Sequence, residues 1–140
     1  VPTFMEESRS IALIKGRGTF GRADGIAVTV GGAYTSGKPC SPGLVPIADI
    51  LENNLVLTFD DLSMLYGNGT GVVCLNPVDP TAFPLAEIEG TWDGGTGRFA
   101  RAGGKWVIEF TFAEPVGDAT KFVAEAGVIK GHITGLRHHD

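Results

Sequence analysis

Four side chains are the candidates for catalytic chemistry in this sequence: the carboxyl groups of Glu89, Glu109 and Glu125 and the phenol of Tyr66. A carboxyl group held in an apolar cavity has a raised pKa and can act as a general acid or base. Glu87 and Glu89 lie two residues apart and face the same side of a predicted strand, and Glu109 lies on the polar face of a later strand. If these polar faces line a cavity, the carboxylates can act together. The alternative is that the faces are exposed to solvent.

Glu125 differs from the other carboxyl groups because the segment around it, Phe122 to Ile129, is apolar on both faces. A carboxylate on a buried strand must be paired or protonated, because an isolated charge in an apolar environment is costly. The sequence leaves two roles open for Glu125, a structural salt bridge and a catalytic group.

Aromatic residues form the candidate substrate-binding set, which consists of Phe59, Trp92, Trp106, Phe110 and Phe112. In a filled barrel these rings belong to the core. In a hollow barrel they form the apolar wall of a pocket for a hydrophobic small molecule, with Tyr66 or a glutamate as the orienting polar group.

Other chemistries find little support in the sequence. The stretch Gly16 to Gly21 matches the spacing of a dinucleotide-binding loop, but the residues that follow alternate like a strand and do not open a helix, so we expect a bulged bend there. The histidines and cysteines lack the spacing of zinc ligands, and we expect no metal. The net charge of −5 with scattered basic residues disfavours nucleic acid, and no apolar run is long enough to span a bilayer.

Two cysteines, Cys40 and Cys74, lie in different predicted segments. A disulfide between them would contribute about 3 kcal/mol in the chain-entropy model. The alternative is a pair of partly buried thiols. We expect export to the periplasm or the cell exterior if the disulfide forms.

The elements expected to position these residues are strands, and residues 1–140 form one domain of all-β class. Twenty-one glycines indicate many turns and bulges. About eight antiparallel strands are predicted, with at most one or two short helical turns, one of them at Ile47–Glu52. A tight hairpin turn is expected at Gly67–Gly69. The expected strands include Ser10–Ile14, Gly25–Val30, Leu55–Phe59, Leu62–Tyr66, Thr70–Leu75, Ala86–Asp93, Lys105–Phe112 and Phe122–Thr134.

The segment between Trp92 and Trp106 is dense in glycine and predicts two tight reversals around at most one helical turn. Its sequence, Glu89-Gly-Thr-Trp-Asp-Gly-Gly-Thr-Gly-Arg-Phe-Ala-Arg-Ala-Gly-Gly104, resembles a segment of bacterial proteins in the allene oxide cyclase and dirigent barrel superfamily. Two weaker features agree, Gly16-Arg-Gly-Thr19 and Leu55-Val-Leu-Thr58. The resemblance implies an eight-stranded, calycin-like barrel with a pocket at one mouth, often trimeric and without a metal or organic cofactor. No active-site motif of the family aligns here.

These observations predict a barrel that binds a hydrophobic small molecule and acts on it as a cofactor-free cyclase or isomerase. The alternative is a non-catalytic secreted barrel that binds another protein or assembles into a homo-oligomer, a dimer or a trimer. Its binding surface would include the loops Ala33–Pro46 and Asn76–Pro84. This alternative predicts no cavity and an apolar patch on the outer surface.

Overall fold

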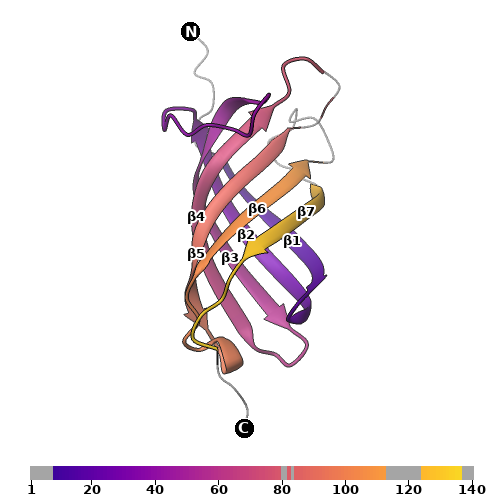
Figure 1. Cartoon of the computed structure of the whole chain (residues 1–140), viewed down its shortest axis with the longest axis vertical. Coiled ribbons are helices and arrows are strands. Elements are labelled where there is room, and N and C mark those ends of the chain that lie inside the picture. Colours follow the sequence, from indigo (N-terminus) through magenta and orange to yellow (C-terminus); the bar gives the residue numbers. More distant parts are fainter. Residues whose placement is uncertain (1–7, 80–81, 83, 113–123, 137–140) are drawn as a thin grey trace.

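The computed structural model describes residues 8–79, 82, 84–112 and 124–136, which form a single curled antiparallel sheet (Figure 1). Each strand pairs with the next one along the chain, so the order in the sheet is the order in the sequence. The elements are β1 (Ser8–Gly18), β2 (Gly21–Ala33), β3 (Val45–Phe59), β4 (Met64–Leu75), β5 (Leu85–Gly95), the 3-10 turn η1 (Gly97–Phe99), β6 (Lys105–Phe112) and β7 (Ala124–Gly131).

The all-β, barrel-like class predicted from the sequence is confirmed, but closure and the number of strands are not. In the described part of the chain there are seven strands, and β1 and β7 remain edges that do not pair with each other. The eighth strand of the prediction arose from dividing β4 in two at Gly67–Gly69. These residues continue the ladder, with Gly67 opposite Leu55 and Gly69 opposite Asn53, and they form no turn.

A second correction concerns Ile47–Glu52, which was expected to form a helical turn. These residues belong to β3, which pairs with β2 on one side and with β4 on the other. The ladder is irregular between Ile50 and Asn53, where β3 carries one extra residue relative to β4. Such a bulge breaks the regular alternation of side chains, and this explains why the segment did not look like a strand in sequence.

The expectation of at most one helical turn in the glycine-rich segment between Trp92 and Trp106 is confirmed. It contains the short turn η1, and Gly94, Gly97 and Gly104 have positive φ angles of 89°, 57° and 111°. These conformations reverse the chain between β5 and β6 and are accessible to glycine at little steric cost. The stretch Gly16 to Gly21 opens no helix, as expected, but it holds no bulge: the β1–β2 register continues without a shift to the pair Gly18 and Gly21, and a tight hairpin turn joins the two strands.

The curl of the sheet separates an inner face from an outer face, and the core lies on the inner face. Its largest buried members include Leu55, Leu65, Ile88, Phe99 and Trp106. Because side chains alternate along a strand, the sequence neighbours of those core residues that lie in strands point outward. The side chains that alternate with the core residues along each strand therefore lie on the outer face.

Trp106 is the largest fully buried side chain, with 1% of its surface exposed, and it packs against strands that carry glycine. Gly69 of β4 and Gly90 of β5 are cross-strand partners, and Gly90 is also the partner of Trp106. A Cβ atom built on Gly69 would lie 2.7 Å from the Trp106 ring, and one built on Gly90 would lie closer still. The glycines thus leave the space that the indole occupies.

Arg98, which follows Gly97 in η1, links several turns at one end of the curled sheet. Its guanidinium lies over the rings of Phe59 and Phe99, 5.0 Å and 4.8 Å from their centroids. The same group donates a hydrogen bond of 2.9 Å to the carbonyl oxygen of Phe20 in the β1–β2 turn and forms an ion pair with Asp61 at 3.3 Å. Arg98 therefore ties together three turns that are distant in sequence.

Candidate functional site

The predicted substrate-binding aromatic residues lie mainly in the core. Phe59, Trp92 and Trp106 are buried there, and Phe110 is partly buried against them. The rings of Trp92 and Trp106 are 5.7 Å apart, and the indole nitrogen of Trp106 donates a hydrogen bond of 2.9 Å to the carbonyl oxygen of Thr91. The side chain of Phe112 is outside the part that the structure describes. The described rings pack against one another and against glycine.

The predicted catalytic residues do not lie with those rings. Glu89 and Glu109 are exposed on the outer face, and Tyr66 is half-buried opposite Val56 on the same face. Register explains the separation, because Ile88 and Ile108 form an inner pair while Glu87 and Glu109 form the neighbouring outer pair. Glu125 belongs to β7, but its side chain is not among those described. The catalytic roles of these residues stay predictions.

The outer face of β1 and β2 carries an apolar cluster that nothing in the described chain covers. We call Ile11, Leu13, Ile26 and Val28 the outer patch; their exposed fractions are 70%, 82%, 49% and 38%. Ile11 is the cross-strand partner of Val28, and Leu13 is the partner of Ile26, so the four side chains are contiguous. A contiguous apolar patch of this kind marks an interaction surface more often than single exposed residues do.

A groove of about 350 Å³ continues the outer patch across β1 to β4. We call it the outer groove; its lining residues are Leu13, Ile14, Lys15, Asp24, Gly25, Ile26, Val56, Thr58 and Met64. Its side chains are mostly apolar, with Lys15 and Asp24 as cross-strand partners on its rim. Neither of these two residues forms an ion pair within the described part of the chain. Both charges are therefore available to a bound partner.

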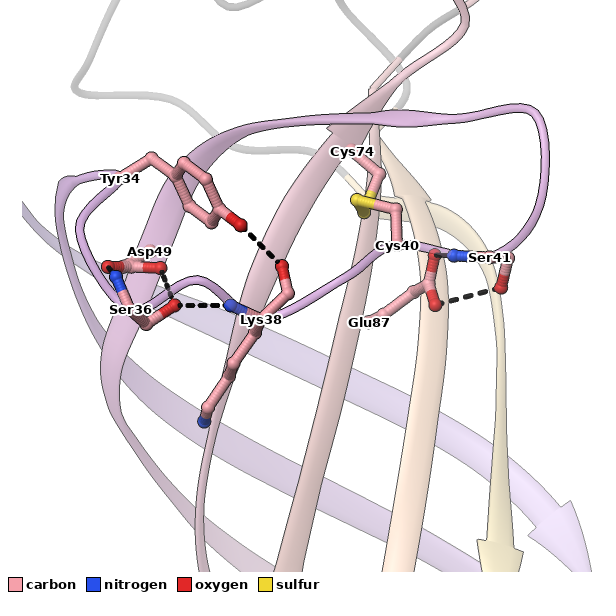
Figure 2. The surroundings of a disulfide bond; sticks show 8 residues. All are labelled: Tyr34, Ser36, Lys38, Cys40, Ser41, Asp49, Cys74 and Glu87. Atoms are coloured by element: carbon pink, nitrogen blue, oxygen red, sulfur yellow. Dashed lines mark hydrogen bonds between the residues drawn. A yellow bond between two sulfur atoms is a disulfide. The ribbon is translucent and has the colours of Figure 1, made fainter.

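The other notable feature of the outer face is the loop of residues 34–44, which we call the covering loop (Figure 2). Asp49 of β3 anchors one end of it and has only 2% of its surface exposed. Its carboxylate accepts hydrogen bonds from the backbone N–H groups of Thr35 and Ser36, both at 2.8 Å, and from the Ser36 hydroxyl at 2.6 Å. The Tyr34 hydroxyl donates to the carbonyl oxygen of Lys38 at 2.7 Å, which folds the loop back on itself.

The covering loop is also attached at its other end. Cys40 forms a disulfide with Cys74 of β4, so the pairing that the sequence left open is present. Beside it, Glu87 of β5 accepts hydrogen bonds from the Ser41 backbone N–H at 3.1 Å and from the Ser41 hydroxyl at 2.9 Å. Under the loop Val72 of β4 is buried although it lies on the outer face.

The pKa of Asp49 is lowered from its ordinary value of 3.8. Burial acts to raise the pKa, but the hydrogen bonds from Ser36 and Thr35 together outweigh it because they stabilise the ionised form. The folded state therefore binds this proton less readily than the unfolded state does. It follows that ionised Asp49 stabilises the fold above pH 3.8, and that this stabilisation is lost as the pH falls through the lower pKa of the folded state.

Asp49→Asn is expected to lower the free energy of unfolding at pH 7 by about 2 kcal/mol, since hydrogen bonds to a charged acceptor contribute more than those to a neutral one. The difference between the variant and the wild type should shrink below pH 3.8. Urea unfolding measured from pH 7 to pH 2.5 tests this. Asp60→Asn, at an exposed position, serves as the control. A difference that stays constant with pH would contradict the role given to the Asp49 charge.

Sequence reasoning expected an apolar outer patch only under the alternative function and did not identify its residues, and it missed the Asp49 anchor and the Glu87–Ser41 contact. A signal for the first was present, because Ile11, Leu13 and Ile14 make β1 apolar on both faces, and a strand of that kind needs cover on both sides. The Asp49 anchor joins residues 13 positions apart, and the Glu87–Ser41 contact joins residues 46 positions apart. No local sequence pattern indicates either contact.

Among the described residues there is no helix with the length and apolar character needed to cross a membrane. Comparisons of this chain with family models, with curated proteins and with solved structures found no match.

Proposed function

We propose that this protein is an assembly module that pairs with a second copy of itself through the outer patch. The observation that carries the proposal is the exposure of Ile11 and Leu13, at 70% and 82%, beside their partners Val28 and Ile26. Fully burying a valine, leucine or isoleucine side chain contributes about 1.5–3 kcal/mol, so four such residues on each copy provide a substantial driving force.

Charge supports a second copy as the occupant of the outer patch. Lys15 and Asp24 lie side by side at one end of the patch and have opposite charges. In a two-fold symmetric contact the same surface meets itself, so that Lys15 of one copy can face Asp24 of the other. The surface is therefore complementary to itself in charge as well as in apolar character.

Sedimentation velocity across a range of protein concentrations tests the proposal. We expect a concentration-dependent dimer in the wild type, and at least tenfold weaker association in Leu13→Glu, because the change places two charges in a symmetric apolar contact. Val78→Glu is the matched control, since Val78 is 86% exposed in the β4–β5 connection, away from the patch. The exchange of charges in Lys15→Asp with Asp24→Lys should restore association that Lys15→Asp alone weakens. A wild-type chain that stays monomeric at high concentration would refute the proposal.

The second candidate function is the binding of a hydrophobic small molecule, with cofactor-free cyclisation or isomerisation as its chemistry. The volume of the outer groove, about 350 Å³, favours it, because pockets for small molecules start at about 300 Å³. Tyr66 lies next to this groove as the cross-strand partner of Val56. Met64→Lys should abolish binding of an apolar fluorescent probe if the groove is the site, because it places a charge among the apolar lining residues.

A further inference from the structure

The place where the covering loop meets the sheet brings together two sulfur atoms and a carboxylate. The Sγ atoms of Cys40 and Cys74 and a carboxylate oxygen of Glu87 all lie within 4.8 Å of one another. Cys74 is buried, and the other two residues are half-buried. They come from the loop, β4 and β5, so the convergence is a product of the fold (Figure 2).

We propose that reduction of the Cys40–Cys74 disulfide converts this place into a binding site for a thiophilic divalent cation of the Zn²⁺ and Cd²⁺ type. The ligands are the two cysteine sulfurs and the Glu87 carboxylate. Two sulfurs and one oxygen match the donors that such ions accept, and a tetrahedral ion keeps a fourth position for water.

The geometry requires only small movements. Ligand atoms around one tetrahedral Zn²⁺ ion are about 3.5 Å apart, given bonds of about 2.3 Å to sulfur and about 2.0–2.2 Å to oxygen. The Cα atoms of Cys40 and Cys74 are 6.0 Å apart, so once the covalent bond is broken the sulfur atoms can separate by side-chain rotation. Glu87 needs to supply one oxygen, and its Ser41 hydrogen bonds hold the carboxylate in position, as outer contacts commonly do for metal ligands.

The covering loop should keep its place after reduction, because most of its attachments do not involve sulfur. Asp49 holds Thr35 and Ser36, Lys38 Nζ contacts the hydroxyl of Thr70, and Ser41 contacts Glu87. The thiols formed by reduction therefore remain next to the carboxylate. Without these attachments the loop would move away and the three ligands would separate.

The chemical steps balance with a phosphine or a dithiol as the reductant. With a phosphine, the S–S bond breaks, phosphorus is oxidised by taking up the oxygen of a water molecule, and two thiols form. The cation then displaces one proton from each thiol and forms two metal–sulfur bonds. Binding of one cation thus releases two protons.

Titration of the phosphine-reduced protein with Cd²⁺, followed by the ultraviolet thiolate-to-metal charge-transfer band, tests the proposal. We expect one Cd²⁺ per chain in the reduced protein and no band in the oxidised protein. Glu87→Gln should bind at least tenfold more weakly, and Glu52→Gln, an exposed glutamate on β3, should bind like the wild type. Proton release, measured on the wild type with an indicator in weak buffer, should give two protons per Cd²⁺ and needs no variant.

Three results would overturn the proposal: a reduced wild type that binds no more Cd²⁺ than the oxidised form, release of fewer than two protons, or unchanged affinity in Glu87→Gln. These results are independent of the assembly proposal, because the three ligands come from the covering loop, β4 and β5, whereas the outer patch lies on β1 and β2.

Discussion

Gly90→Ala is expected to lower the free energy of unfolding by about 3 kcal/mol, at the upper end of the usual cost of overpacking. A Cβ atom at this position would meet the carbonyl oxygen of Asn68 and the ring of Trp106. Neither can move away easily, because the carbonyl belongs to the β4 backbone and the indole is buried and hydrogen-bonded to Thr91. Urea unfolding followed by tryptophan fluorescence measures the loss.

Gly16→Ala provides the matched control for this prediction. Gly16 also lies in a strand, but a Cβ atom there would have no heavy atom within 4 Å, and its φ angle is not positive. We expect this variant to be as stable as the wild type or slightly more stable, because alanine restricts the unfolded chain. Equal losses in the two variants would show that the Trp106 packing does not require glycine at position 90.

The double variant Cys40→Ser with Cys74→Ser is expected to lower the free energy of unfolding by about 3 kcal/mol relative to the oxidised wild type. The two cysteines are 34 positions apart, and the bond restricts that whole segment in the unfolded state. In the chain-entropy model, loss of the disulfide raises the conformational entropy of the unfolded chain and so stabilises the unfolded state. Urea unfolding of oxidised wild type and of the double variant gives the difference.

The reduced wild type is the control for the double variant, because it lacks the bond but keeps both sulfur atoms. We expect the two to unfold at the same urea concentration. The native circular dichroism of both should match that of the oxidised protein, since the hydrogen bonds of Asp49 and Glu87 hold the covering loop in place. If the urea midpoint of the wild type did not change on reduction, the stabilising role of the disulfide would be contradicted.

Several elements were predictable because their signals are local. The alternation in Lys105–Phe112 gave β6 with its bounds, and the glycines from Gly94 to Gly104 gave the reversal between β5 and β6. Gly67–Gly69 was misread as a turn for a physical reason. Glycine in a strand can mark either a turn or a close approach by another group, and here the approaching group is Trp106, almost 40 positions later.

The amino-acid sequence by itself determined the all-β class and which side chains share a face, because both follow from a two-residue period along the chain. Only the tertiary structure decided which of those faces is buried. Trp106 fills the inner face, the covering loop hides Val72 and Asp49 on the outer face, and Ile11 and Leu13 on that same face stay exposed. Burial depends on the curl of the sheet and on contacts between residues far apart in sequence, such as Ser41 with Glu87, and no local pattern contains that information.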